Sequence, residues 1–380
     1  MAAVKSVAVP AARPDLKIFF DARWTRLDTH DGISRYGASL LTALARIHPV
    51  TMLIYDRRQL KLLPAGVPYV VVNPPMSPLE LLLPSKLNRL GAEVVFSPLQ
   101  VMGSWGRHFK LILTQQDLIY YDHPKPPTVL PRLVQFLWRQ YHRSYAPGRL
   151  MLNRADVIAT VSHTSKNEIE RRRLTHRPVV VVYNAPPELA GTTAPPVASK
   201  AAGKRRGLTY MGSFMPYKNV ELLLQALPLL PGYEVHLPSR ISPARQSELM
   251  GPVAAADRQR VHFYNGASDV EYAKMLDQSL ALVSASTSEG FGLPLIEAMV
   301  RGVPVACTDM PVFHEVGGKA ALYFDPADPA DLAGQVRRLE QPAVRAQAVQ
   351  AGYEQAAKFS WDDSARALLA AMETLVGQRP

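Results

Sequence analysis

Residues 288–297 read Ser-Glu-Gly-Phe-Gly-Leu-Pro-Leu-Ile-Glu, and this stretch decides how the chain folds around its most distinctive motif. The residues immediately before it, 279–285, form an apolar run of strand length. Pro294 suits the first turn of a helix, because the N–H that proline lacks would have no helical partner there. Gly302 then ends the helix. The stretch therefore predicts a strand, a glycine loop and the N-terminus of a helix.

Such a loop is suited to bind an anion. The unpaired N–H groups and the positive dipole end of a helix N-terminus attract a diphosphate, and glycines let the backbone come close to it. Glu289 precedes the loop and Glu297 lies one turn inside the helix, so both carboxylates can reach hydroxyl groups of the same ligand. Two acids beside phosphates suggest a polyol attached to them. The alternative is that the two acids only favour the start of the helix electrostatically.

The composition is that of a globular protein with two domains. The chain has 380 residues, of which 47% are hydrophobic. No run approaches the ~18 apolar residues of a membrane span, and residues 1–16 lack the sustained apolar core of a secretory signal. Cys307 is the only cysteine, so it cannot form an intrachain disulfide; we interpret it as structural and compatible with a reducing cytoplasm. The net charge of +11 is compatible with nucleic acid, an anionic membrane face or a phosphorylated ligand.

Strand-like runs alternate with helical runs along the chain, which predicts parallel sheets with crossover helices. Residues 186–203, rich in Pro, Ala, Thr and Gly, are predicted to be a linker. The predicted strands before it are residues 16–21, 69–73, 94–97, 111–114, 157–161 and 179–183. Those after it are residues 208–211, 234–237, 261–264, 280–284, 303–307 and 321–324.

Residues 288–297, followed by Ala298-Met299 and by Gly-Val-Pro-Val at 302–305, resemble the E-x7-E signature of the retaining glycosyltransferases of family 4. The resemblance implies the GT-B fold, an α/β architecture of two Rossmann-like domains facing across a cleft. It implies an acceptor-side domain over residues 1–186, a nucleotide-sugar domain over residues 187–358, and a C-terminal helix in 359–380 that returns to the N-terminal domain. In the family the first acid contacts the transferred sugar and the second holds the ribose.

A second motif, residues 210–219, reads Tyr-Met-Gly-Ser-Phe-Met-Pro-Tyr-Lys-Asn and resembles the family's G-[ST]-x-x-P-x-K-N loop. The resemblance implies that Lys218 binds the donor diphosphate, where its charge would stabilise the leaving group. Tyr217 stands where many relatives have arginine, which leaves Arg240 or Arg205 as a second phosphate cation. The alternative is a solvated lysine at the end of a loop. The donor-binding residues implied by both motifs are Ser213, Lys218, Glu289, Gly290, Phe291, Gly292, Leu293 and Glu297.

Residues 28–36, Asp-Thr-His-Asp-Gly-Ile-Ser-Arg-Tyr, follow the first predicted strand and resemble the glycine loop at which these enzymes approach the transferred sugar and the acceptor. The resemblance implies that Gly32 and Ile33 offer backbone N–H groups and that Arg35 and Tyr36 support this acceptor-side loop. Alone, Asp-Gly is only a turn signal.

Residues 114–119, Thr-Gln-Gln-Asp-Leu-Ile, resemble the family's strand-end T-x-H-D-L-I segment. Gln116 stands in place of a histidine that commonly lies beside the transferred sugar. Because glutamine forms hydrogen bonds but does not titrate, an imidazole role does not carry over to this chain. Asp117 remains as a candidate catalytic residue beside Glu289 and Lys218. His123 is an alternative, although it also fits an ordinary surface turn.

Residues 132–154 form a basic, aromatic segment with three competing interpretations: a solvated helix face, a membrane-surface patch and an acceptor groove. Its arginines are Arg132, Arg139, Arg143, Arg149 and Arg154, and its aromatic residues include Phe136, Trp138, Tyr141 and Tyr145. The segment has neither an RNA-binding signature nor the Cys/His spacing of a zinc site.

The resemblance implies an enzyme, a retaining hexosyltransferase of polysaccharide or glycolipid biosynthesis. The pattern resembles the mannosyltransferase branch most, so GDP-mannose is the expected donor and a carbohydrate or lipid-linked molecule the acceptor. Attack on the same face of the sugar, with the leaving phosphate helping to take the acceptor proton, is the mechanism implied by the family. The chain has no Asp-x-Asp motif, so we expect no metal site and no cofactor beyond the nucleotide sugar. The expected location is the cytoplasm, with the inner face of the membrane left open.

Three alternatives remain from the sequence alone. A UDP-sugar-dependent glycosyltransferase would use the same motifs, because the base is read largely by backbone groups. A GT-B epimerase or hydrolase of nucleotide sugars would use the same cleft without an acceptor. Outside enzymes, a basic nucleic-acid-binding or membrane-binding protein would show steep salt dependence and no selectivity among nucleotides.

Overall fold

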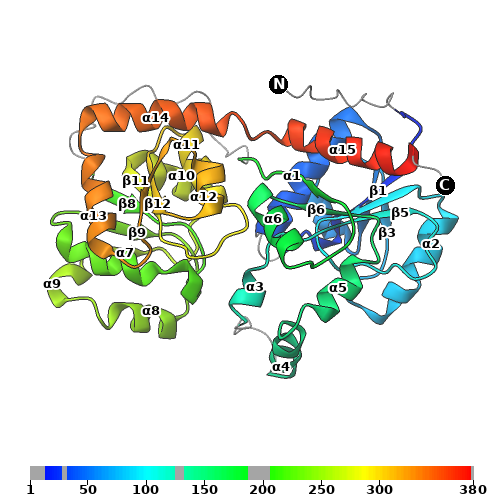
Figure 1. Cartoon of the computed structure of the whole chain (residues 1–380), viewed down its shortest axis with the longest axis horizontal. Helices are drawn as coiled ribbons and strands as arrows, with labels where there is room; N and C mark the ends of the chain where they lie inside the picture. The colour runs from blue at the N-terminus through cyan, green and yellow to red at the C-terminus, as the bar shows by residue number, and fades with distance from the viewer. Residues whose placement is uncertain (1–12, 28–31, 125–131, 187–205, 378–380) are drawn as a thin grey trace. The chain divides into compact units, whose positions relative to one another are not determined.

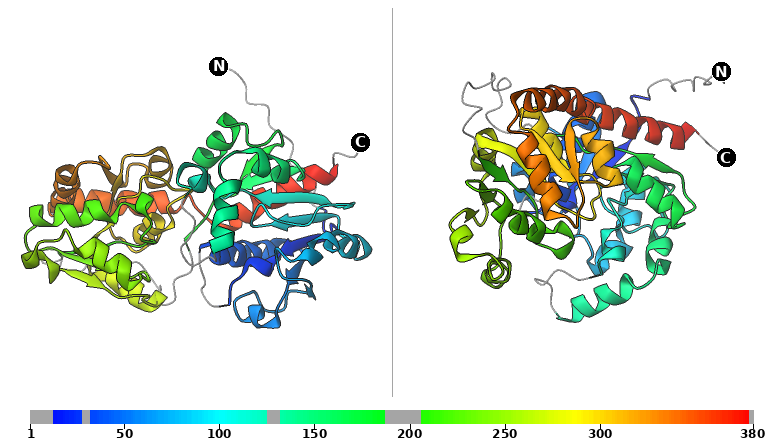
Figure 2. Two further views of the ribbon diagram at one scale, coloured as in Figure 1. Left: turned by 90° about the horizontal axis from the view of Figure 1, so that it is seen from below. Right: turned by 60° about the vertical axis from the view of Figure 1, so that its left-hand side comes forward.

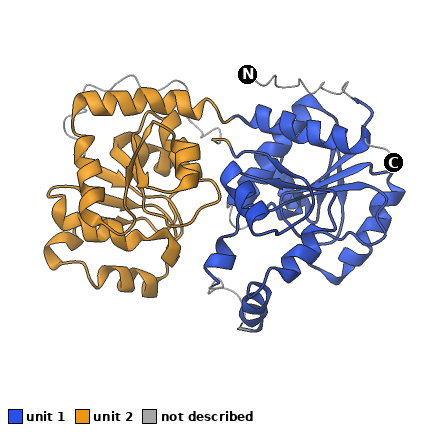
Figure 3. Cartoon of the chain, viewed as in Figure 1, with its two compact units in different colours: residues 1–184, 360–380 blue, residues 185–359 orange. Residues whose placement is uncertain are grey.

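The computed structural model describes residues 13–27, 32–124, 132–186 and 206–377, and the chain divides into two compact units. Unit 1 consists of residues 1–184 and 360–380, and unit 2 consists of residues 185–359 (Figure 3). The boundaries that we predicted were 186/187 and 358/359. Most of the predicted linker lies outside the described residues.

Unit 1 is built on a parallel sheet (Figure 1). The sheet has seven strands in the order β3-β2-β1-β4-β5-β6-β7. Its strands are β1 (Ile18–Asp21), β2 (Val50–Ile54), β3 (Tyr69–Val71), β4 (Val94–Ser97), β5 (Lys110–Thr114), β6 (Val157–Thr160) and β7 (Val179–Val181). We did not predict β2, because its apolar residues follow helix α1 after a break of only two residues, His48 and Pro49. The other six strands were predicted to within a few residues at their ends.

Helices cover both faces of this sheet (Figure 2). The helices of unit 1 are α1 (Gly32–Ile47), α2 (Leu83–Arg89), α3 (Ile119–Asp122), α4 (Arg132–Tyr141), α5 (Ala146–Leu152), α6 (His163–Arg171) and α15 (Trp361–Gly377). Short 3-10 helices are η1 (Ala22–Trp24), η2 (Arg57–Lys61) and η3 (Pro78–Leu81). Helix α15, which follows all of unit 2 in the sequence, packs along α1 and belongs to unit 1.

Unit 2 contains a six-stranded parallel sheet with the order β10-β9-β8-β11-β12-β13. Its strands are β8 (Gly207–Thr209), β9 (Glu234–Leu237), β10 (Val261–Phe263), β11 (Ser279–Ser284), β12 (Val305–Thr308) and β13 (Ala321–Phe324). Its helices are α7 (Val220–Ala226), α8 (Pro243–Met250), α9 (Ala255–Arg258), α10 (Asp269–Gln278), α11 (Leu293–Val300), α12 (Pro311–Gly317), α13 (Pro329–Arg338) and α14 (Pro342–Ala356), with η5 (Pro216–Lys218) and η6 (Leu227–Leu229).

The central strands are buried on both faces, because helices lie on each side of the sheets. All four residues of β1 and of β4 are buried, and so are all six of β11. Cys307 on β12 is fully buried, and this burial raises the pKa of its thiol. Among the helices that the structure describes, none is long and apolar enough to span a membrane.

The strand orders fix where a ligand can bind. Each order reverses once near the middle of its sheet, between β1 and β4 in unit 1 and between β8 and β11 in unit 2. In open parallel sheets, ligands bind beyond the carboxyl ends of the strands at this switch point. In unit 2 these ends lead into both predicted donor motifs, residues 210–219 after β8 and residues 285–293 after β11.

Candidate active site

The loop after β8 carries Lys218 at the end of the 3-10 helix η5. Asn219 follows in the left-handed conformation, with φ 51°, and its side chain donates a hydrogen bond of 2.9 Å to the carbonyl oxygen of Pro326. The backbone N–H of Thr287 donates to the carbonyl oxygen of Tyr217 over 2.8 Å. These contacts join the loops after β8 and β11, and they fix the position of Lys218 beside the E-x7-E motif.

The glycine loop between β11 and α11 is closely packed. Gly292 has φ 99° and lies at the N-cap of α11. A Cβ atom there would lie 2.8 Å from Cε1 of Phe313, so the position requires glycine for two reasons. Phe291 is 3% exposed and its ring lies edge-on to that of Phe359, at 5.3 Å between centroids. Phe291 therefore anchors the loop, and Gly290 beside it is also buried.

Lys218 and Glu289 form an ion pair at this edge of the sheet. The distance from Nζ of Lys218 to Oε1 of Glu289 is 2.5 Å, and the side chains are 16% and 14% exposed. The hydroxyl of Ser286 donates to the same Oε1 atom over 2.9 Å. Two donors thus hold one oxygen of the carboxylate, and no other side-chain hydrogen bond to Glu289 occurs among the described residues.

Glu297 lies one helical turn into α11 and is 7% exposed. The phenol of Tyr272, on α10, donates a hydrogen bond of 3.2 Å to Oε2 of Glu297. Each acid of the E-x7-E motif therefore accepts a hydrogen bond from a hydroxyl of a neighbouring residue, Ser286 for Glu289 and Tyr272 for Glu297. Such bonds orient a carboxylate and satisfy part of its hydrogen-bonding capacity.

The remaining donor-side predictions are placed as follows. Ser213 is exposed, and its carbonyl oxygen accepts a hydrogen bond of 2.6 Å from the phenol of Tyr210. Burial raises the pKa of Tyr210, and the charge of Glu289 raises it further. Leu293, the first residue of α11, is half-buried. Arg240 is exposed after β9, and Arg205 lies outside the described residues.

In unit 1, the described part of the predicted acceptor-side loop is helical. Gly32, Ile33 and Arg35 lie in the first turn of α1, and residues 28–31 are outside the described part of the chain. Gly32 is exposed and Ile33 half-buried, so the helix N-terminus rather than a loop presents their backbone. Tyr36 is 1% exposed and packs against Trp361, with 5.9 Å between ring centroids. Tyr36 therefore contributes to the packing of α1 against α15.

The side chains of the segment after β5 form hydrogen bonds with backbone groups. The side-chain amide of Gln116 donates to the carbonyl oxygen of Pro98 over 3.1 Å, and Oδ1 of Asp117 accepts from the N–H of Ile119 over 3.0 Å. Asp117 thus stabilises the first turn of α3. His123 lies at the C-terminal end of the same helix. These contacts give Gln116 and Asp117 structural tasks, and their part in catalysis remains a prediction.

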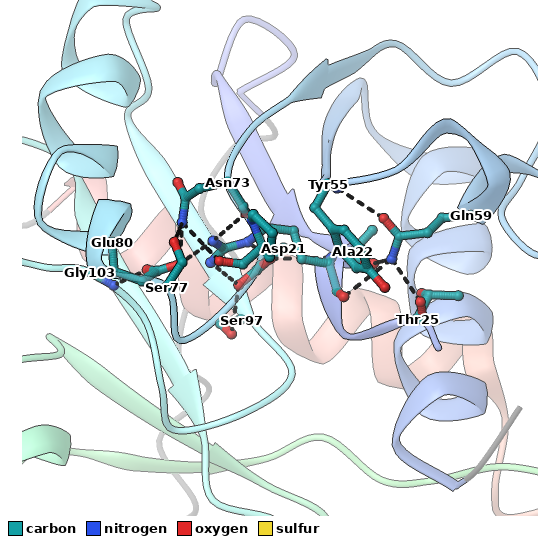
Figure 4. Close-up of polar contacts among 12 residues, drawn as sticks. Asp21, Ala22, Thr25, Tyr55, Gln59, Asn73, Ser77, Glu80, Ser97 and Gly103 are labelled. Atoms are coloured by element: carbon teal, nitrogen blue, oxygen red, sulfur yellow. Dashed lines mark hydrogen bonds and ion pairs between the residues drawn. The ribbon is translucent and has the colours of Figure 1, made fainter. Parts of the chain in front are cut away.

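The switch point of unit 1 contains a buried charge network that we did not predict (Figure 4). Arg23 in η1 holds Asp21 at the end of β1 through two hydrogen bonds, of 2.7 and 2.9 Å, and both side chains are fully buried. Its guanidinium also pairs with Glu80, whose other oxygen accepts from the N–H of Gly103 over 2.8 Å. Ser97, at the end of β4, donates to Asp21 over 3.2 Å.

Sequence reasoning therefore missed three sets of residues. Ser286 could have been found, since it lies three positions before Glu289, but hydroxyl residues are common in loops. Tyr272 lies 25 positions before Glu297 on another helix, so no local pattern pointed to it. Arg23 and Asp21 are close in sequence, but their partner Glu80 is 57 positions from Arg23. In the described ranges, no three His, Cys, Asp or Glu side chains lie close enough together to hold a metal ion.

Comparison with known proteins fits this geometry. Residues 196–355, which cover both donor motifs, match the family model described as glycosyl transferases group 1. A relative from Escherichia coli, O-antigen chain mannosyltransferase B, is 30% identical over 252 residues, which are 60% of this chain and 62% of that protein. Residues 196–355 of this chain therefore form a glycosyl transferase group 1 domain.

Other comparisons extend the likeness to most of the chain. The O-antigen chain mannosyltransferase RfbU of Salmonella typhimurium is 26% identical over 333 residues, covering 82% of this chain and 87% of that protein. A sucrose-phosphate synthase from Thermosynechococcus elongatus superposes with a TM-score of 0.70 at 18% identity, over 96% of this chain and 100% of the other. The predicted GT-B fold class, with two Rossmann-like domains, is confirmed.

Proposed function

We propose that this glycosyl transferase moves mannose from GDP-mannose to a carbohydrate or lipid-linked acceptor, with retention of the anomeric configuration. The observation that carries the proposal is the convergence of Lys218, Glu289 and Glu297 at the switch point of unit 2, around the N-terminus of α11. A cation, two acids and a helix N-terminus suit a nucleoside diphosphate that carries a sugar. Two relatives named as mannosyltransferases favour mannose over other hexoses.

Each group has one task in this proposal. Glu297 holds ribose hydroxyls, while the amides of the glycine loop and Lys218 bind the diphosphate. Glu289 orients the transferred sugar; because Lys218 and Ser286 both contact its Oε1 atom, its Oε2 atom is the one turned to the ligand. As the glycosidic bond breaks, the bonding electrons pass to the departing phosphate, and Lys218 stabilises the charge that accumulates there.

The acceptor hydroxyl attacks the same face of the sugar that the phosphate leaves. Its proton passes to the phosphate oxygen, so no side chain need act as a base in this step. Gln116 and Asp117 would then shape the acceptor side through hydrogen bonds, in keeping with their backbone contacts after β5. The proposal uses no metal ion, since the charge of the diphosphate is met by Lys218 and backbone N–H groups.

Calorimetry with nucleotides tests the donor assignment. We expect the protein to bind GDP more tightly than UDP or ADP. In Lys218→Ala, GDP affinity should fall by roughly 1.5–3 kcal/mol, the contribution of one charge-assisted contact, while guanosine affinity is unchanged. The control is Lys274→Ala, which removes an exposed lysine of α10 in the same unit and should bind GDP as the parent does.

Each other outcome contradicts part of the proposal. Tighter binding of UDP would identify a UDP-sugar donor. Release of free mannose from GDP-mannose at the same rate with and without acceptor would identify a hydrolase. Undiminished GDP affinity in Lys218→Ala would remove Lys218 from the diphosphate site, and binding of anionic polymers without any nucleotide would leave a basic binding protein.

A further inference from the structure

Helix α4 (Arg132–Tyr141) projects from the body of unit 1, as Figure 1 and the right-hand view of Figure 2 show. One face of the helix is held by aromatic rings. The ring of Trp138 lies edge-on to that of Tyr120, at 4.9 Å between centroids. The ring of His142, just after the helix, is tilted against that of Trp138 at 4.5 Å and lies edge-on to that of Tyr121 at 5.3 Å. These contacts fix which side of α4 faces the protein.

The opposite face of α4 is apolar and uncovered. Leu133, Phe136 and Leu137 are 70%, 54% and 57% exposed, at the i, i+3, i+4 spacing that places them on one side of a helix. Val134 beside them is 41% exposed. An uncovered stripe of large apolar side chains marks a surface that binds another apolar surface.

The charge around this stripe is of one sign. Residues 123–155 contain five arginines and one lysine, and no aspartate or glutamate. Arg139 and Arg143 are exposed, and neither forms an ion pair with any residue that the structure describes. By contrast, Arg149 is held by the carbonyl oxygens of Arg172 and Arg173, at 3.0 and 2.9 Å.

We propose that α4 docks this protein on an anionic lipid bilayer, with Leu133, Phe136 and Leu137 in the acyl boundary and Arg139 and Arg143 among the lipid phosphates. A helix with an apolar face and arginines beside it lies in the plane of a membrane surface in this way. Anionic headgroups add attraction for each basic side chain near the surface. The inference does not depend on which sugar or nucleotide the active site uses.

A second copy of the chain fits the exposed face of α4 less well than an anionic bilayer does. Symmetric pairing through α4 would bring Arg139 and Arg143 of the two copies together, because such an interface repeats the same residues on both sides. Residues 123–155 offer no carboxylate to offset that repulsion. A bilayer rich in phosphate groups provides the opposite charge.

Flotation with lipid vesicles tests the proposal on the full chain. Vesicles of equal parts phosphatidylglycerol and phosphatidylcholine should bind the protein, and vesicles of phosphatidylcholine alone should bind it weakly. The triple variant Leu133→Gln, Phe136→Gln, Leu137→Gln should lower the affinity on the order of 100-fold. Arg139→Gln with Arg143→Gln should lower it on the order of 10-fold, and should reduce its dependence on salt.

A matched control lies in the same unit. Leu79, Leu81 and Leu82 are 54%, 74% and 64% exposed in and after η3, where Glu80 is the charged residue. Replacing these three leucines by glutamine removes as much exposed apolar surface, and it should leave vesicle binding unchanged. Circular dichroism and nucleotide binding of both triple variants should match the parent, because all six positions are exposed.

Three results would overturn the proposal. One is equal vesicle binding by the α4 triple variant and the η3 control. Another is equal binding of the parent to neutral and anionic vesicles, which removes the role of the arginines. The third is a parent that fails to float but forms a dimer that the α4 substitutions dissociate, which would assign the apolar stripe to a second copy of the chain.

Discussion

Both switch points hold a cation beside a carboxylate, but the two pairs differ in burial. In unit 1, Arg23 and Asp21 are fully buried, and Glu80, Ser97 and the backbone of Gly103 complete their hydrogen bonds. In unit 2, Lys218 and Glu289 remain 16% and 14% exposed, and Ser286 supplies one further hydrogen bond. The first pair is fully occupied by the protein itself. The second is partly exposed, and the two hydrogen bonds from side chains to Glu289 share one of its two carboxylate oxygens.

A charge pair at the carboxyl ends of the strands is therefore not by itself evidence of a ligand-binding site. The planar guanidinium of Arg23 binds Asp21 through two parallel hydrogen bonds, a geometry that lysine cannot form. Lysine is a compact charge on a flexible chain and can turn from one anion to another. The pair in unit 1 therefore belongs to the scaffold, and we propose that the pair in unit 2 binds a ligand.

The largest expected effect comes from removing the buried cation. Arg23→Met leaves Asp21 and Glu80 without a countercharge, and breaking such a pair costs about 3–5 kcal/mol of folding free energy. Lys218→Met is the matched control and should cost less than about 1 kcal/mol, because its pair is partly solvated. Urea unfolding, followed with probes in each unit, measures both values.

An aggregated Arg23→Met protein would agree with this expectation only if Lys218→Met, made in the same way, folds. If both variants lose the same stability, the distinction between scaffold pair and ligand pair is wrong. If Lys218→Met is the less stable of the two, the assignments must be exchanged.

A second effect should separate the two acids of unit 2. Glu289→Gln should lower kcat on the order of 100-fold with little change in nucleotide affinity, because it acts on the sugar in the transition state. Glu297→Ala should instead weaken GDP binding on the order of 10-fold, since it removes a charged hydrogen-bond acceptor for the ribose. Calorimetry and initial rates measure the split, with Glu354→Gln on the exposed face of α14 as the control.

Small and equal effects of the Glu289 and Glu297 substitutions on both measurements would contradict this division. The two acids would then serve only to favour the start of α11, the alternative that the sequence left open.

For the last prediction, we expect no change in the rate of transfer. If Lys218 and backbone N–H groups meet the charge of the diphosphate, transfer should persist in excess chelator at an unchanged rate. The pH profile of transfer by His123→Gln should have the same limbs as that of the parent, because no imidazole takes part. Activity abolished by chelator and restored by one divalent ion would show that the metal-free mechanism is wrong.

The sequence predicted much of the fold, because both sheets are parallel and their buried strands are continuous apolar runs between turn signals. Strand β11 and the glycine loop before α11 follow from residues 279–292 alone. Strand β2 was missed because only His48 and Pro49 separate it from α1, so a local pattern gives no clear end to the helix.

The site was predictable only where its residues lie in one continuous motif. Glu289, Gly292 and Glu297 fall within nine positions, and the structure keeps them around one helix N-terminus. The contact of Tyr272 with Glu297 depends on how α10 packs against the sheet, and so it arises from tertiary structure. The same holds for Arg23 and Glu80, which the strand order brings together.

The pairing of α15 with α1 sets an order of events on the ribosome. Tyr36 packs against Trp361, and the hydroxyl of Ser364 donates to the carbonyl oxygen of Tyr183, so unit 1 needs residues made after all of unit 2. Synthesis adds about 5–20 residues per second, which leaves the apolar face of α1 uncovered for many seconds while unit 2 emerges. The nascent first half is thus the stage at which a chaperone has most to protect, and unit 2 is the first part able to finish folding.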